Sequence, residues 1–166
     1  MSSFVSLEDV KKIYQMGEVQ IMAAAGIDFQ IEKGEFAVVV GPRGAGKTTV
    51  LNILGGMDTA SSGRVIVDGK DIAQYSPRQL TAYRRDDIGF VFQFYNLIPT
   101  LTVRKNILMP LMLDKRKPNQ EYFDQIVRSL GIEDKLDFLP NQLSGGQQQR
   151  AAIARSLIYR PALLLA

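Results

Sequence analysis

The sequence predicts an α/β fold in which a core carries an antiparallel β subdomain and an inserted α-helical subdomain. The first observation is the apolar run at residues 36–40, FAVVV, which is typical of a strand buried on both faces and precedes a glycine turn and a helix. The second is the alternation of residues 3–10 and 27–31, which indicates strands with one exposed face. The third is the change to helical spacing of apolar residues after residue 93.

The strands that precede the glycine turn are expected to pair with each other. Residues 3–10 and 27–31 should form an antiparallel pair beside the strand at 36–40, which follows a turn at 32–35. Residues 15–26 separate the paired strands. Within them GEVQIMAAAG fits either a continued strand or a short helix.

The elements after the glycine turn have recognisable ends. A helix with an apolar side ends at the glycines 55–56, and residues 64–69, RVIVDG, predict a strand and a turn. Ser76 can cap the next helix, with Pro77 at its first position. This helix ends before a strand at 88–92.

The later part of the chain is mainly helical in pattern. Residues 94–142 are expected to form the helical subdomain, so that residues 1–93 and 143–166 make up the core and the β subdomain. Ser144 can cap a last helix. The apolar residues 162–166 then indicate another buried strand.

Composition excludes several classes of function. The 166 residues are 46% hydrophobic and 22% charged, which suits one globular domain with a real core. The net charge of +3 comes from scattered basic residues, so no nucleic-acid partner is expected. Absence of cysteine excludes disulfides and suits a reducing cytoplasm. No apolar run approaches the ~20 residues that span a bilayer, and the start lacks a signal-peptide core, so the chain is expected to be soluble by itself.

The glycine turn has the chemistry of a phosphate-binding loop, or P-loop. Residues 41–48 match G-x-x-x-x-G-K-[ST], in which backbone N–H groups surround a di- or triphosphate at a helix start. The Lys47 ammonium would neutralise the β- and γ-phosphates, and the Thr48 hydroxyl would complete a Mg²⁺ shell. The residues expected to line the nucleotide here are Gly41, Pro42, Arg43, Gly44, Ala45, Gly46, Lys47, Thr48 and Thr49.

A second anion site is predicted where a serine and two glycines open the last helix. Free N–H groups and a hydroxyl stand at this helix start, with no side chain to block approach. Because one nucleotide rarely needs two phosphate sites in one molecule, we expect two copies to meet head to tail, each offering residues 143–147 to the γ-phosphate held by the other's residues 41–48. The residues that would touch this phosphate are Ser144, Gly145, Gly146 and Gln147.

These two segments resemble those of the ATP-binding-cassette (ABC) ATPases, whose phosphate loop and LSGGQ signature match residues 41–48 and 143–147. The resemblance covers the whole chain. It implies a P-loop NTPase core that binds ATP and Mg²⁺ and hydrolyses the γ-phosphate in a homodimer.

The resemblance also assigns roles to single residues. Gln93 looks like the family's glutamine loop, where the side chain contacts Mg²⁺ and the attacking water. Lys47 and Gln93 are thus the expected catalytic residues, and Thr48 and Gln93 the expected metal ligands. Tyr14 sits where the family places an aromatic ring against the adenine, a stacking contact worth about 1 kcal/mol.

Longer segments are similar to one subgroup of the family, which drives macrolide-type export and lipoprotein release from bacterial inner membranes. These segments are YQMGEV, NILGGMD, FQFYNLIPTLTVRKNILMPL and LSGGQQQRAAIARSL. The similarity implies a peripheral protein on the cytoplasmic face of the inner membrane, beneath a transmembrane permease. A cytoplasmic helix of the permease would rest in a groove between the core and residues 94–142. The transported substrate would be chosen by the permease.

The chain departs from the family pattern in two respects. Arg43 and Ala45 stand where the family often has serine, a change that backbone-mediated binding should tolerate. The family also follows a strand like 162–166 with an Asp for Mg²⁺, a Glu that polarises water and a later histidine, none of which occurs in these 166 residues. We therefore expect these residues by themselves to bind nucleotide but to be a poor or inactive ATPase.

Two other functions fit the same motifs. One is a soluble ABC protein that acts on DNA or ribosomes, and the other is a nucleotide-binding regulator without catalysis. Chromosome-type ABC proteins interpose a long coiled coil between the two motifs, and residues 94–143 leave no room for one. An acidic pair directly after residue 166 would identify a catalytic cassette.

Overall fold

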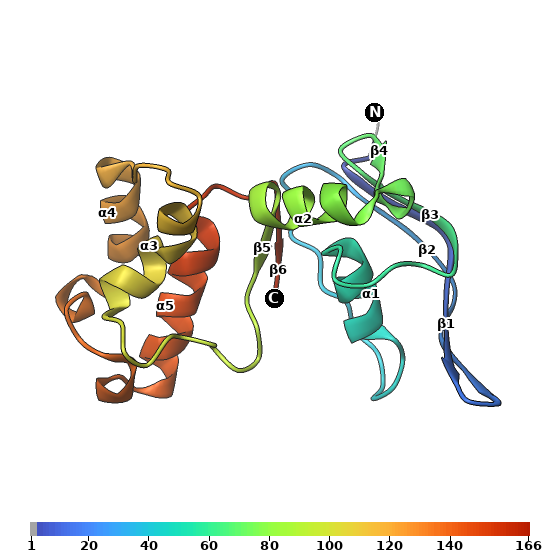
Figure 1. Cartoon of the computed structure of the whole chain (residues 1–166), viewed down its shortest axis with the longest axis horizontal. Helices are drawn as coiled ribbons and strands as arrows, with labels where there is room; N and C mark the ends of the chain where they lie inside the picture. The colour runs from blue at the N-terminus through green and yellow to red at the C-terminus, as the bar shows by residue number, and fades with distance from the viewer. Residues whose placement is uncertain (1–2) are drawn as a thin grey trace. The chain divides into compact units, whose positions relative to one another are not determined.

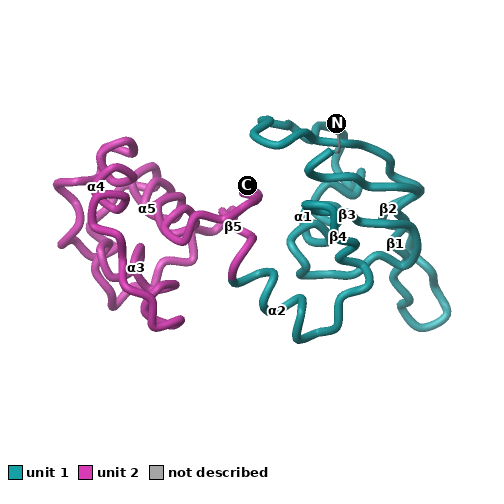
Figure 2. Tube along the Cα trace, turned by 90° about the horizontal axis from the view of Figure 1, so that it is seen from above, with its two compact units in different colours: residues 1–85 teal, residues 86–166 magenta. Residues whose placement is uncertain are grey.

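The computed structural model describes residues 3–166, and its contacts divide the chain after Arg85 into two compact units (Figure 2). We call Met1–Arg85 the N-terminal unit and Asp86–Ala166 the C-terminal unit. The predicted division into residues 1–93 with 143–166 on one side and 94–142 on the other stays a prediction. Across residues 3–166, no helix has the length and apolar character needed to cross a bilayer.

An antiparallel sheet forms the centre of the N-terminal unit (Figure 1). Its order is β2-β1-β3-β4, and its strands are β1 (Val5–Met16), β2 (Val19–Ile31), β3 (Ser62–Val67) and β4 (Lys70–Asp71). The predicted pair of strands at 3–10 and 27–31 is confirmed as part of β1 and β2, and the undecided residues 15–26 continue the same hairpin. Several apolar residues of β1 and β3 are buried. They include Val5, Leu7, Val10 and Val65.

The predicted buried strand at residues 36–40 is wrong. This segment has no strand hydrogen bonds, and Phe36, Val38 and Val40 are 90%, 68% and 82% exposed. A strand needs a hydrogen-bonding neighbour, and the four described strands of this unit pair among themselves. The antiparallel pair is therefore hydrogen-bonded to β3 and not to residues 36–40.

Two helices pack in the N-terminal unit. Helix α1 (Lys47–Leu54) buries Val50, Ile53 and Leu54 and contacts β2 and β3, as its apolar spacing predicts. A short 3-10 turn, η1 (Ile72–Gln74), precedes α2 (Pro77–Asp86), whose start confirms the predicted cap because the Ser76 hydroxyl accepts a hydrogen bond from Gln79 N at 3.4 Å. The Tyr83 hydroxyl of α2 donates to Leu54 O at 2.8 Å and so holds the end of α1.

The C-terminal unit is mainly helical, with three helices around one core (Figure 1). The helices are α3 (Val103–Leu113), α4 (Gln120–Ser129) and α5 (Gly145–Leu157), with short turns η2 (Glu133–Lys135) and η3 (Pro140–Gln142). Their apolar faces meet in a cluster that includes Ile107, Phe123, Val127 and Ala151, which are all almost fully buried. The predicted helical pattern of residues 94–142 is confirmed as local structure.

A two-stranded parallel sheet completes this unit. Strand β5 (Ile88–Phe90) pairs with β6 (Leu163–Leu165), which confirms the strands predicted at 88–92 and 162–166 over shorter lengths. A Cβ at Gly89 would lie only 2.8 Å from Ser156 O, so glycine lets the end of α5 approach β5.

Candidate functional site

The glycine loop before α1 is built around a close backbone approach. Gly44 and Gly46 have φ angles of +84° and +82°, which favour glycine. A Cβ at Gly46 would lie 2.2 Å from Ala23 O of β2, so no other residue fits without displacing a strand. The first backbone hydrogen bond of α1 runs from Val50 N to Gly46 O at 2.9 Å. The N–H groups of the first helical turn come before that bond and have no partner within the helix, so they could bind an anion.

Lys47 lies inside this loop. Its ammonium donates to Gly41 O and to Pro42 O, both at 2.7 Å. A phosphate in the loop would compete with these carbonyl oxygens for a full positive charge and would gain a stronger, charge-assisted hydrogen bond.

The loop fits Mg²⁺ only as part of a metal nucleotide. Among residues 3–166, no cluster of three or more acidic side chains is placed to hold a metal. Thr48 is exposed at the start of α1 and can supply one hydroxyl oxygen. Mg²⁺ keeps several waters and commonly takes its remaining ligands from substrate phosphates, which suits a site with a single protein hydroxyl.

Tyr14, the expected adenine contact, is fixed by two residues that the sequence analysis missed. Its hydroxyl donates to Asp58 Oδ2 at 2.5 Å, and Lys12 Nζ lies 4.9 Å from the ring centroid. Lys12 also pairs with Asp58 Oδ1 at 2.6 Å. The hydrogen bond to the Asp58 carboxylate raises the pKa of Tyr14. Partial burial opposes ionisation of Asp58, but hydrogen bonds from Lys12 and Tyr14 prevail and lower its pKa.

The signature segment forms the start of α5. The Ser144 hydroxyl accepts a hydrogen bond from Gln147 N at 3.3 Å, and Gln147 Oε1 accepts one from Ser144 N at 2.8 Å. This capping box confirms the predicted helix start. Gly145 and Gly146 are exposed, which leaves the helix start open to a ligand.

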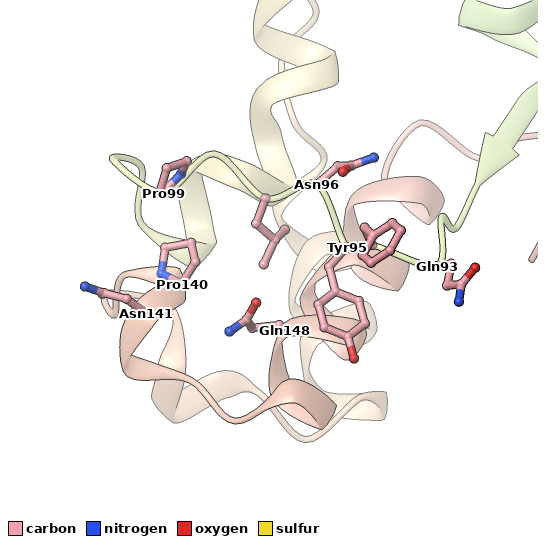
Figure 3. Close-up of a pocket in the computed structure, with 9 residues that line it drawn as sticks. Gln93, Tyr95, Asn96, Pro99, Pro140, Asn141 and Gln148 are labelled. Carbon is pink, nitrogen blue, oxygen red and sulfur yellow. The ribbon is translucent and has the colours of Figure 1, made fainter.

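Gln93 lies on the loop that follows β5, at the rim of a hollow of about 610 Å³ (Figure 3). Its side chain is exposed. In this view the Gln148 side chain of α5 lies between Pro140 and Tyr95. The residues that line the hollow are Gln93, Phe94, Tyr95, Asn96, Leu97, Pro99, Pro140, Asn141 and Gln148.

Arg155 of α5 ties this loop to the signature helix. Its guanidinium donates to Asn96 O at 2.6 Å and to Tyr95 O at 2.7 Å, and burial lowers its pKa. The Tyr95 hydroxyl lies 3.5 Å from the position a Cβ at Gly145 would take. The glutamine loop and the signature segment are therefore attached to one helix. The sequence gives no signal for this role of Arg155.

The structure thus assembles the predicted residues into two groups. In the N-terminal unit, Tyr14 and the loop at residues 41–49 lie on elements joined through Asp58. In the C-terminal unit, Gln93 and residues 144–147 lie on a loop and a helix joined through Arg155.

Comparison with known proteins gives a family match over most of the chain. Residues 24–166 match the family described as ABC transporter. An uncharacterised ABC transporter ATP-binding protein of Thermotoga maritima is 41% identical, over 100% of this chain and 72% of its own length. The lipoprotein-releasing system ATP-binding protein LolD of Shewanella frigidimarina is 39% identical, over 99% of this chain and 70% of its own length.

A solved structure agrees with this match. It is a dimeric post-hydrolysis state of the ATP-binding cassette MJ0796 bound to ADP and phosphate. The match covers 98% of this chain and 72% of the MJ0796 chain, with 42% sequence identity and a TM-score of 0.83. The predicted fold class is confirmed by this likeness. The predicted similarity to the macrolide-export and lipoprotein-release subgroup is confirmed by relatives named for those two systems.

The close approach at Gly46 leads to a prediction with a matched control. Gly44→Ala and Gly46→Ala should each lower the free energy of unfolding by roughly 1–2 kcal/mol, because both place an alanine in the left-handed backbone conformation. Only Gly46→Ala adds a clash with Ala23 O, because the space around Gly44 is open. Urea unfolding should show Gly46→Ala less stable than Gly44→Ala by about 1–3 kcal/mol. Equal stability of the two variants would contradict the close approach.

Proposed function

The chain belongs to the ABC transporter family as an ATP-binding subunit, and from this premise we propose that it binds MgATP and couples ATP hydrolysis to the movement of a membrane permease. The observation that carries the proposal is the loop at residues 41–48. There Gly46, which approaches a carbonyl of β2 too closely for a side chain, precedes α1, and the ammonium of Lys47 at the start of α1 is held on loop carbonyls. This arrangement suits a triphosphate because both the helix start and Lys47 favour negative charge.

We assign the parts of the nucleotide to residues as follows. The phosphates lie against the backbone of residues 41–49, and Lys47 exchanges its carbonyl partners for the β- and γ-phosphates. The adenine stacks on Tyr14. On the family resemblance, Thr48 and Gln93 would hold Mg²⁺, which would supply positive charge to the phosphates.

Hydrolysis follows the common scheme for phosphoryl transfer, in which positioning and charge stabilisation do most of the work. Lys47 and the first-turn N–H groups of α1 stabilise charge on the γ-phosphate. Gln93 orients the attacking water.

The signature segment completes the site from a second copy. The relative MJ0796 is described as dimeric in a state bound to ADP and phosphate, which supports the same assembly here. The start of α5 offers the Ser144 hydroxyl and open N–H groups at Gly145 and Gly146 to a γ-phosphate held by the other copy. Nucleotide binding thereby favours a head-to-tail homodimer.

The permease contacts the hollow beside Gln93. Phe94 at this hollow is 78% exposed and offers an apolar ring that a protein partner would bury. Because Arg155 joins the loop to α5, movement of a permease segment at the hollow is transmitted to the signature segment. In this proposal the protein works at the cytoplasmic face of the inner membrane.

Nucleotide binding is tested by replacing the loop lysine. Lys47→Ala should abolish the rise in melting temperature that MgATP causes, because the charge that balances the phosphates is lost. Lys33→Ala, which removes an exposed lysine from a turn of the same unit, should keep the full rise. An unchanged MgATP response in Lys47→Ala would reject residue 47 as a phosphate ligand.

Permease contact is tested at the hollow. Phe94→Ala should lower permease-stimulated phosphate release in lipid vesicles by roughly fivefold or more, because an exposed aromatic anchor is lost. Binding of MgATP to the isolated protein should stay the same. Leu113→Ala is the matched control, since Leu113 is equally exposed at 78% but lies outside the hollow. Equal stimulation of both variants would place the permease elsewhere.

A further inference from the structure

Two side chains of the N-terminal unit, those of Lys12 and Tyr14, meet at the Asp58 carboxylate. One oxygen accepts the Tyr14 hydroxyl at 2.5 Å, and the other accepts Lys12 Nζ at 2.6 Å. Lys12 Nζ also donates to Thr59 O at 2.7 Å, which leaves the ammonium little freedom. The proposed mechanism uses Tyr14 but gives Asp58 and Lys12 no task.

The backbone of Asp58 is anchored to α1. Met57 N and Asp58 N both donate to Asn52 O of α1, at 2.8 Å and 3.1 Å. The position of the carboxylate is therefore set by α1. This helix begins at Lys47, in the phosphate loop. A ligand that reaches from Tyr14 to the phosphate loop would contact both, and α1 sets the distance between them.

A second set of hydrogen bonds joins the loop after α1, which carries Asp58, to β1, the strand that carries Tyr14. Ser61 N donates to Lys11 O at 2.8 Å, and Ile13 N donates to the Ser61 hydroxyl at 3.0 Å. These bonds place the backbone of β1, whereas the Asp58 bond places the end of the Tyr14 side chain. The Asp58 bond therefore acts on the Tyr14 side chain itself.

The ring itself is prepared for stacking on one side. Tyr14 is 37% exposed, and the Lys12 ammonium lies over its ring at 4.9 Å from the centroid. The cation covers one face, so a planar ligand would use the other. The carboxylate of Asp58 balances the charge of the Lys12 ammonium, so the surroundings of the Tyr14 ring are nearly neutral.

We propose that Asp58 is a positioning residue that holds Tyr14 at a set spacing from the phosphate loop, so that the site selects a nucleoside triphosphate over a bare polyphosphate. This inference rests on the proposed function, in which Tyr14 stacks on the base. Asp58 acts through the tyrosine hydroxyl and does not touch the nucleotide.

The test compares two ligands across matched variants of the purified protein. Dissociation constants for MgATP and for magnesium tripolyphosphate, which has no base, are measured for wild type, Tyr14→Phe, Asp58→Ala and the double variant. Tyr14→Phe keeps the ring and the Lys12–Asp58 pair but loses the tether, by which we mean the hydrogen bond from the Tyr14 hydroxyl to Asp58. We expect each single variant to weaken MgATP binding by roughly fivefold, about the worth of one stacking contact. Tripolyphosphate binding should change by less than about twofold.

The double variant tests whether the two residues act as a unit. If Asp58 works only through Tyr14, the double variant should bind MgATP about as well as either single variant, because effects within one interaction do not add. Quenching of the fluorescent base of ethenoadenosine triphosphate gives a direct sign of stacking. It should be strong in wild type and weaker in Tyr14→Phe and Asp58→Ala.

Several outcomes would overturn the proposal. Tighter MgATP binding by Asp58→Ala would show that the carboxylate restrains Tyr14 from the base. Full MgATP affinity and quenching in Tyr14→Phe would show that the tether is not needed, even if Asp58→Ala fails to fold. Equal loss of both ligands would assign Asp58 a general structural role.

The proposed function fails in a different way. In that case wild type would show no MgATP binding that depends on Lys47, or no preference for MgATP over tripolyphosphate. If wild type prefers MgATP and Tyr14→Ala abolishes the preference while Asp58→Ala keeps it, only the role of Asp58 is rejected.

Discussion

The approach of Gly46 to the carbonyl of Ala23 is the contact on which both the fold and the chemistry of the N-terminal unit depend. It fixes the start of α1 against β2, and with it the direction of the first-turn N–H groups. Lys47, the next residue, is held on the carbonyl oxygens of Gly41 and Pro42. These bonds hold the loop in one conformation, so in the proposed function less ordering is needed when a phosphate replaces the carbonyl partners of Lys47. The C-terminal end of the same helix holds Asp58, and through it the ring of Tyr14.

The C-terminal unit has a corresponding connector in Arg155. The partly buried guanidinium donates to two consecutive loop carbonyls, which keeps the segment after Gln93 attached to the helix that begins with the signature segment. In the proposed function, this contact lets one end of the unit respond to a permease and the other to a phosphate. Each unit thus joins two of the predicted site segments through one charged residue.

The features that local sequence determines were predicted well. The glycine loop, the caps at Ser76 and Ser144 and the helices after them depend on neighbouring residues, and the structure has each of them where the sequence places it. The strand at residues 36–40 was predicted wrongly because strand formation depends on a partner elsewhere in the chain, which an apolar run does not reveal. Asp58 and Arg155 were missed for a similar reason: their contacts join residues 44 and 60 positions apart, and neither lies in a recognisable motif.

The central claim is that one triphosphate is held by the start of α1 in one molecule and by the start of α5 in another. Mixing two defective variants, Lys47→Ala and Ser144→Arg, tests it by sedimentation with MgATP. Each variant alone damages both sites of a homodimer, whereas their heterodimer keeps one site with both segments intact. The account predicts monomers for each variant alone and a MgATP-dependent dimer for the mixture. A mixture that stays monomeric while wild type dimerises, or a Lys47→Ala protein that dimerises by itself with MgATP, would contradict it.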